Sequence, residues 1–549
     1  MKSLLAAAAL SAALMPCAAP ASVDEELPTR AEASEYRETS RSADVLAFCR
    51  ELAARSADAR LAYIGRSAGG QPIPMLILGR PAPASPAELL RDERLCVCIQ
   101  ANIHAGEVEG KEAALALARD IVLGGRGAPL ERLVILVVPN LNPDGNDRVS
   151  TENRSYQGGP EGGVGLRANA QGLDINRDWI KLETPEAHAI VRLLNLWDPA
   201  LLVDCHTTNG SPHREPLTYA PPQNPSGDPD VLLYARETLL ADADARLLSR
   251  FGYESIPYGT FVDWLDPSRG WRTFGHQPRY TTNYVGLRNR LAVLIETYAF
   301  ADFRTRVRST YGFLAALLEH CAENSATISR LVEGADRRAY ARAEAPAPDP
   351  QRDSIAVEVE LRPLPEPLEI LGYEMEPYTD ERGRARAWAT EREVTYSLPY
   401  FGDFVPLRTV RMPAAYFLDP GMEDVVGKLR HHGIAVERLT RDAELALQRF
   451  RVDELESAEA IYQGHISTSI RGEWEEVEET LTAGTWVVRT AQPLGSLAAY
   501  MLEPESDDGL LYWNFFDRYL TRQWGGGLNP YPVTRAMRQQ HLPTESPAP

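Results

Sequence analysis

Between Leu61 and Leu318, short apolar runs alternate with longer amphipathic segments, and this alternation restricts the possible folds most strongly. The predicted strands are Leu61 to Gly65, Ile73 to Leu78, Leu95 to Gln100, Leu133 to Pro139, Leu201 to Cys205 and Leu291 to Ile295. The predicted helices are Gly110 to Leu123, Pro185 to Leu196, Asp230 to Ser249 and Phe303 to Glu319. Such a pattern predicts an α/β fold with a mixed, largely parallel central sheet and helices on both faces.

The composition changes near residue 341 and divides the chain into two domains. Residues 341–353 are rich in Ala and Pro and have no apolar periodicity, which indicates a linker. The first domain is then expected over residues 22–340. A smaller, β-rich α+β domain is expected over residues 354–536, and its aromatic segment 511–516 is interpreted as core. The polar residues 537–549 are expected to form a disordered tail.

The first 21 residues have the pattern of a secretory signal peptide. Lys2 supplies a positive start, residues 4–15 are apolar, and Ala19-Pro20-Ala21 is a small-x-small cleavage signal. A lipid anchor on Cys17 is the alternative, but Pro16 stands where such a signal has a small residue. We expect a secreted or periplasmic protein without a membrane span, because no later segment has the roughly 20 apolar residues that a spanning helix needs.

Charge and cysteine content narrow the possible partners. The net charge of −20 repels phosphate backbones, so nucleic acid is not an expected partner. Five cysteines remain after signal removal, few and odd in number, and they imply no disulfide framework. Cys96 and Cys98 share one face of a predicted strand and are interpreted as core residues, with a zinc or redox role as the alternative.

Two histidines and a carboxylate follow predicted buried strands. His104 and Glu107 come just after the run 95–100, and His206 follows the run 201–205. Carboxyl ends of neighbouring parallel strands meet at one edge of a sheet, where reactive groups collect. Two imidazoles and a carboxylate are a three-ligand set that leaves zinc a fourth position for water. The sequence therefore predicts one hydrolytic Zn²⁺ site, although His206 alone could be an ordinary core histidine.

Two further sets of polar residues fit hydrolysis at such a site. Glu296 ends the apolar run 291–295, where burial would raise its pKa toward the range useful for a general base. The alternative is a strand-end glutamate turned to solvent. Arg167, Asn176 and Arg177 lie in a Gly-containing loop, and the planar guanidinium of Arg can bind both oxygens of a carboxylate.

Together these residues resemble the zinc carboxypeptidase family of carboxypeptidase A type. The resemblance covers about residues 40–325. Its motifs, in family order, are His104-x-x-Glu107 with Glu109-Gly110-Lys111-Glu112, Asn142-Pro143-Asp144-Gly145, Asp174-Ile175-Asn176-Arg177, Asp204-Cys205-His206 and Glu296. It implies a mixed eight-stranded sheet with helices on both faces, and one zinc held by His104, Glu107 and His206.

The same resemblance implies the roles of the other site residues. Glu296 is expected to activate the zinc-bound water and to protonate the leaving amine. Asn176 and Arg177 are expected to bind the terminal carboxylate of the substrate, and Arg167 to stabilise the oxyanion. Tyr284 is named as the tyrosine that covers the substrate, although neither Tyr280 nor Tyr284 matches the family pattern cleanly. The C-terminal domain is not part of the general family pattern.

The sequence thus favours a secreted zinc metallocarboxypeptidase acting on peptides or proteins. One alternative is a zinc amidohydrolase acting on peptidoglycan stem peptides or small N-acyl substrates. Another is a zinc-free binding protein, which would require the loss of a ligand or of Glu296, and all four residues are present. The resemblance implies that side-chain preference depends on residues within about 260–290. Neither that preference nor the oligomeric state follows from the sequence.

Overall fold

The computed structural model describes residues 27–546 apart from 209–210, 343–348, 350–351 and 522–526. The expected signal peptide therefore lies outside the described residues, as does most of the expected linker. Within the described ranges, no helix combines the length and apolar character needed to cross a membrane.

A mixed eight-stranded sheet forms the centre of the first domain, as the sequence predicted. Its strand order is β1-β2-β4-β3-β5-β10-β6-β7. The bounds are β1 (Ala59–Arg66), β2 (Pro72–Leu78), β3 (Leu95–Ala101), β4 (Leu133–Val138), β5 (Leu201–Thr207), β6 (Leu217–Ala220), β7 (Ser255–Pro257) and β10 (Leu291–Thr297). The central strands β4, β3, β5 and β10 are parallel to one another, whereas β2 and β6 flank them in antiparallel pairing. Their carboxyl ends therefore share one edge.

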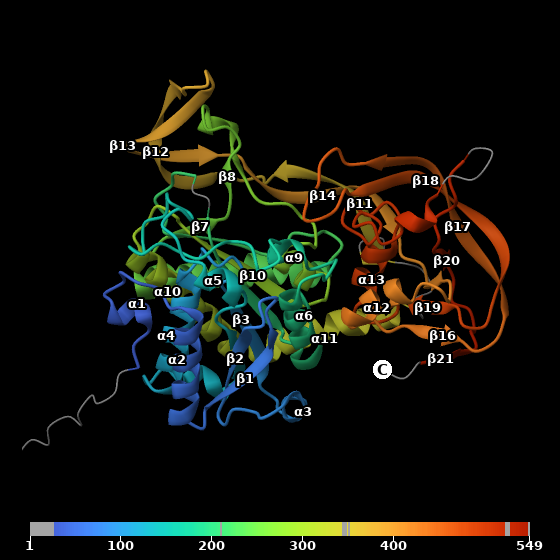
Figure 1. Cartoon of the computed structure of the whole chain (residues 1–549), viewed down its shortest axis with the longest axis horizontal. Helices are drawn as coiled ribbons and strands as arrows, with labels where there is room; N and C mark the ends of the chain where they lie inside the picture. The colour runs from blue at the N-terminus through green and yellow to red at the C-terminus, as the bar shows by residue number, and fades with distance from the viewer. Residues whose placement is uncertain (1–26, 209–210, 343–348, 350–351, 522–526, 547–549) are drawn as a thin grey trace, which may run out of the picture.

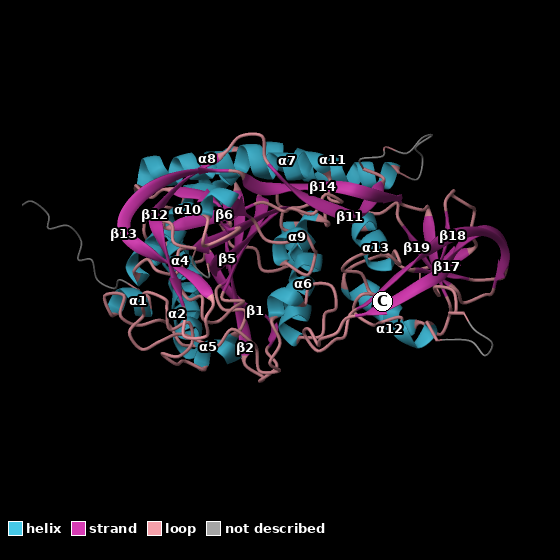
Figure 2. Ribbon diagram, turned by 90° about the horizontal axis from the view of Figure 1, so that it is seen from above, coloured by secondary structure: helices cyan, strands magenta, loops and turns pink. Residues whose placement is uncertain are grey.

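Helices cover both faces of this sheet because its central strands are apolar on both sides (Figure 2). One face packs against α2 (Ser42–Arg55), α4 (Glu109–Val122), α7 (Pro229–Tyr234), α8 (Leu240–Arg246), α10 (Phe303–Glu323) and α11 (Ser325–Ala341). The other packs against α6 (Pro185–Trp197) and α9 (Thr281–Gly286). The predicted helix over 230–249 is α7 and α8 with π-helical turns at Ala235–Leu239 and Leu247–Phe251. Short helices α1 (Arg30–Ala33), α3 (Pro86–Leu89) and α5 (Pro143–Asp147) complete this domain.

The C-terminal domain is built on an antiparallel seven-stranded sheet. Its strand order is β18-β17-β20-β15-β19-β16-β21. The bounds are β15 (Ala415–Leu418), β16 (Glu437–Leu439), β17 (Ala443–Ser457), β18 (Thr468–Leu481), β19 (Trp486–Arg489), β20 (Thr534–Ala536) and β21 (Thr544–Glu545), with helices α12 (Glu423–His431) and α13 (Gly495–Leu502). Trp513 and Phe516 of the aromatic segment are buried, as expected. The expectation of a disordered tail was wrong at residues 544–545, because β21 pairs with β16.

Two further sheets connect the domains. A four-stranded sheet combines β11 (Ser354–Pro363) and β14 (Tyr400–Arg411) with β9 (Trp271–Arg272) and β8 (Thr260–Phe261). The hairpin of β12 (Leu368–Thr379) and β13 (Ala385–Leu398) extends back over the first domain (Figure 1). There the Arg214 amide donates to the carbonyl of Leu371 at 2.8 Å. The C-terminal domain is therefore bound to the first domain by main-chain pairing as well as by side chains.

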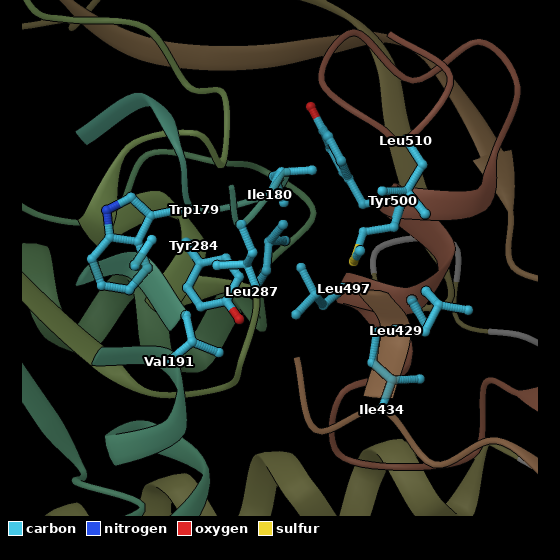
Figure 3. Close-up of a cluster of buried hydrophobic side chains, with 14 of the residues drawn as sticks. Trp179, Ile180, Val191, Tyr284, Leu287, Leu429, Ile434, Leu497, Tyr500 and Leu510 are labelled. Carbon is cyan, nitrogen blue, oxygen red and sulfur yellow. The ribbon is translucent and has the colours of Figure 1, made fainter. Parts of the chain in front are cut away.

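The two domains also share one hydrophobic core (Figure 3). Trp179, Ile180 and Tyr284 of the first domain belong to the same buried cluster as Leu429 and Leu497 of α12 and α13. The five described cysteines, Cys49, Cys96, Cys98, Cys205 and Cys321, are all buried and free. This confirms Cys96 and Cys98 as core residues.

Candidate active site

A pocket lies at the carboxyl edge of the central sheet. It is lined by His104, Glu107, Arg167, Asn176, Arg177, Asp204, His206, Thr207, Tyr258, Phe274, Tyr280, Thr281, Thr282, Leu294 and Glu296. The fold thus brings together all the site residues predicted from the sequence, with the exception of Tyr284.

Three donor atoms converge at the base of the pocket. The Nδ1 atom of His206 lies 3.0 Å from Nδ1 of His104 and 2.9 Å from Oε2 of Glu107, and the last two atoms are 3.2 Å apart. Tetrahedral bonds of about 2.0 to 2.2 Å place neighbouring zinc ligands roughly 3.3 Å apart. All three residues are buried. Among the described residues they are the one group with a metal-binding arrangement, and its dimensions fit Zn²⁺.

On each histidine, the ring nitrogen that faces away from the metal position contacts a carboxylate. Nε2 of His104 lies 3.0 Å from Oδ1 of Asp174, and Nε2 of His206 lies 2.8 Å from Oδ2 of Asp204. These contacts leave both Nδ1 atoms facing the metal position, the second-sphere arrangement usual for zinc histidines. Neither aspartate was predicted to have a role of its own. Asp204 could have been found, because residues two apart on a strand share a face.

A tight turn after β3 sets the position of Glu107. The Glu107 amide donates to the carbonyl of His104 at 2.9 Å, which closes the turn through Ala105 and Gly106. A Cβ atom on Gly106 would lie 2.9 Å from the side chain of Arg154 and 3.0 Å from a backbone oxygen, so a larger residue would force these neighbours to shift. The turn brings the side chains at positions 104 and 107 together, as predicted.

The two carboxylate oxygens of Glu107 have different partners. Oε2 faces the histidines, whereas Oε1 accepts hydrogen bonds from Arg154 at 3.0 Å and from Arg167 at 3.2 Å. Arg154 also donates to the carbonyl oxygens of Thr207 and Thr208. Arg154 was missed because it belongs to no motif or periodic segment. Despite burial, the neighbouring His104 and then the charge of Arg154 hold the pKa of Glu107 well below its usual range.

Glu296 faces the metal position from the neighbouring strand. It is the register partner of His206 in the parallel pair of β10 and β5. Burial, together with the charge of Glu107, raises the pKa of Glu296 to about 8 against the attraction of His206. Within the described part of the chain, no side chain or amide donates to its carboxylate. The carboxylate is therefore available to a water molecule or a substrate.

The loop of Asn176 and Arg177 lies beside the metal position. The Asp174 side chain caps this short 3₁₀ turn by accepting from the Asn176 amide at 2.9 Å. The Asn176 side chain accepts from the amide and hydroxyl of Thr281 at 3.0 and 2.9 Å. The Arg177 guanidinium lies 4.5 Å from the ring centre of Tyr280. One positive side chain is thus fixed on this side of the pocket.

The assignment of Tyr284 as a substrate-covering residue was wrong. Tyr284 is fully buried in the shared core, where its ring packs on Trp179 and its hydroxyl lies 2.7 Å from Nδ1 of His432. It lies on the face of α9 that packs against the core. Helix α9 was not predicted from the sequence, so the burial of Tyr284 was not foreseen. The tyrosines that line the pocket are Tyr258 and Tyr280.

The geometry is that of a mononuclear zinc hydrolase, with two histidines, one glutamate and a second, nearby glutamate. Residues 45–206 match the sequence model of the zinc carboxypeptidase family. The chain is 23% identical over 485 residues to carboxypeptidase 2 of Trichophyton rubrum, covering 83% of this chain and 80% of the fungal protein. It is 32% identical over 166 residues to human carboxypeptidase Z, covering 28% of this chain and 24% of that protein.

A solved metallo-carboxypeptidase from Burkholderia cenocepacia is 19% identical, with a TM-score of 0.38, over 51% of this chain and 69% of that chain. The family match and the sequence relatives agree with the ligand set in the structure. The chain carries a zinc carboxypeptidase domain and is a zinc metallocarboxypeptidase.

Proposed function

We propose that this enzyme removes residues from the free carboxyl ends of peptides or proteins, with Glu296 as the general base. The observation that carries the proposal is the placement of Arg177, Glu296 and the His-Glu-His set around one pocket. A positive side chain beside a hydrolytic centre suits a substrate with a terminal carboxylate. A substrate cleaved at an internal bond has no terminal carboxylate at that position for such a group to bind.

The roles follow from position and chemistry. A zinc ion held by His104, Glu107 and His206 would supply a positive charge that acidifies a water molecule and polarises the scissile carbonyl. Glu296 accepts a proton from that water, whose oxygen adds to the carbonyl carbon. The carbon–nitrogen bond then breaks, and Glu296 returns the proton to the leaving amine.

Two further groups act on the substrate. Arg167 lies on the metal side of the pocket, 3.2 Å from Oε1 of Glu107, and its positive charge stabilises the oxyanion. Asn176 and Arg177 bind the terminal carboxylate and so set the cleavage at the last peptide bond. The leader-like residues 1–21 support activity outside the cytoplasm.

The test compares a peptide with a free carboxyl end and the same peptide with an amidated end. We expect amidation to lower kcat/KM on the order of 10²-fold, because a charged partner left unpaired costs a few kcal/mol. Arg177→Ala should lower kcat/KM similarly on the free acid and little further on the amide, since both changes remove one interaction. The exposed Arg382 provides the matched control, Arg382→Ala. Equal cleavage of acid and amide by the unaltered enzyme would favour an amidohydrolase.

A further inference from the structure

The hairpin of β17 and β18 ends in a tight turn that reaches the first domain. The amides of Tyr462 and His465 donate to each other's carbonyl oxygens at 2.7 and 3.0 Å. The two residues between them, Gln463 and Gly464, have φ angles of +50° and +84°. Positive φ at both central residues defines the type I′ turn, which continues the twist of the flanking strands. The turn at the end of the hairpin therefore has a defined backbone conformation.

Three consecutive contacts join this turn to the loop beside the metal position. The hydroxyl of Tyr462 accepts a hydrogen bond from Nε of Arg177 at 2.9 Å. The Gln463 side chain accepts from the Asp174 amide at 2.9 Å, and Nε2 of His465 lies 3.0 Å from a carboxylate oxygen of Glu183. The C-terminal domain thus contacts the loop that carries both the partner of His104 and the carboxylate-binding arginine.

The hydrogen bond to Tyr462 completes the support of Arg177. The ring of Tyr280 covers one face of the guanidinium, and Nη1 donates to the carbonyl of Asn176 at 2.8 Å. With Nε bonded to Tyr462, Nη2 is the one guanidinium nitrogen of Arg177 without a hydrogen-bond partner among the described residues. Without the Tyr462 hydroxyl, the long side chain of Arg177 could rotate about its terminal torsions.

Tyr462 is itself held by neighbouring side chains. Its ring stacks on Trp513 with a 6.1 Å separation and a 23° angle between the planes. The guanidinium of Arg279 lies 5.6 Å from the Tyr462 ring and 5.0 Å from the Trp513 ring, and it pairs with Asp508 at 2.9 Å. Arg279 directly precedes Tyr280, the residue that covers Arg177. Two of the three groups that support the Arg177 guanidinium, Tyr462 and Tyr280, are therefore tied to the C-terminal domain.

We propose that Tyr462 of the C-terminal domain is a positioning residue that orients Arg177 for the terminal carboxylate of the substrate. The inference rests on the proposed function, because it assigns the C-terminal domain a part in the same carboxylate recognition. The accessory domain then supplies part of the substrate specificity from a position 285 residues away in sequence.

The test is Tyr462→Phe, which removes the hydroxyl and keeps the ring that stacks on Trp513. A hydrogen bond to a charged group that is partly exposed contributes about 1 kcal/mol, so KM for a free-acid peptide should rise about 3- to 10-fold. The value of kcat should stay within about twofold, because no group that acts on the scissile bond is altered. Tyr378→Phe removes a hydroxyl from an exposed tyrosine of β12 and should leave both constants unchanged. Thermal denaturation establishes that both variants are folded.

The double variant shows whether Tyr462 acts through Arg177. In the Arg177→Ala background, adding Tyr462→Phe should leave kcat/KM unchanged, because the group that it orients is absent. The same several-fold loss in that background would overturn the inference. If Arg177→Ala lowers kcat/KM but Tyr462→Phe does not, this inference fails and the proposed function stands. If Arg177→Ala itself has no effect, the proposed carboxylate recognition fails as well.

Discussion

At the scale of the residue, Glu296 is placed for proton transfer. It lies on the strand beside His206, and burial raises the pKa of its carboxyl group. It does not belong to the three-residue set that fits the metal. Its proton-transfer role can therefore be separated from metal binding by a single substitution.

Glu296→Gln should retain one zinc per chain and lose about 10²- to 10⁴-fold in kcat, the contribution of a positioned general base. Glutamine has the same shape but cannot accept the proton. Metal analysis and steady-state kinetics on the same sample give the two readouts, with Glu473→Gln on the exposed edge of β18 as the control. Turnover within a few-fold of the unaltered enzyme would remove Glu296 from the mechanism.

The location of a site residue could be predicted where its side chain follows directly from a strand. His104, Glu107, His206 and Glu296 all stand at or just after the carboxyl ends of apolar strands, and the structure brings them into one pocket. Arg154 reaches Glu107 from a loop 47 residues along the chain. No local pattern encodes such a contact, because it depends on how the loop folds over the sheet.

At the scale of the element, α12 contacts the first domain through a buried histidine just after its last turn. Nδ1 of His432 accepts from the Tyr284 hydroxyl at 2.7 Å, and Nε2 donates to the carbonyl of Ile180 at 2.9 Å. Burial, with a smaller effect of the Arg288 charge, lowers the pKa of His432 to about 3. The neutral imidazole is therefore the form that fits this contact.

Acid should weaken this contact. Between pH 6.5 and 3 the unfolded chain binds a proton at His432 that the folded chain excludes, so the free energy of unfolding falls as pH falls. From pH 7 to 5 the loss is about 2 kcal/mol, from 1.36 kcal/mol per pH unit below the ordinary histidine pKa of about 6.5. Urea denaturation at pH 7 and pH 5 should show a smaller loss of unfolding free energy for His432→Gln than for the unaltered protein. The control is His431→Gln, at the exposed neighbouring residue, which should lose as much as the unaltered protein. Equal losses in all three proteins would contradict the role of His432.

Whether a helix or strand could be predicted depended on the length of its apolar pattern. The long apolar runs predicted the central strands and the helices α4, α6 and α10 within a few residues, whereas α2 and α11 were not predicted. The two-residue strands β8, β9 and β21 carry no periodicity that a sequence can show. They form only because a partner strand from another part of the chain lies beside them.

At the scale of the whole molecule, the linker marks a boundary in sequence but not in packing. The expected linker falls between the end of α11 and the start of β11. The apolar pattern shows which residues are buried but not against which partner, so it could not reveal that Trp179 and Leu497 share one core.

We therefore expect one cooperative unfolding transition for the full chain. Losing the C-terminal domain would expose Trp179, Ile180 and Tyr284 to water, at about 1.5 to 3 kcal/mol for each large apolar side chain. Calorimetry should give a single peak whose calorimetric and van't Hoff enthalpies agree. Two separated peaks would show that the domains are stable independently.

The shared core also has a consequence for the order of events during synthesis. The chain leaves the ribosome from its N-terminus, and N-terminal domains generally fold first. Here the apolar surface around Ile180 has no cover until α12 and α13 have been made, some 240 to 320 residues later. During that interval the nascent protein exposes an apolar surface and is prone to aggregation. We therefore expect the unfinished chain to depend on chaperones, and to do so for longer when translation between residues 341 and 502 is slow.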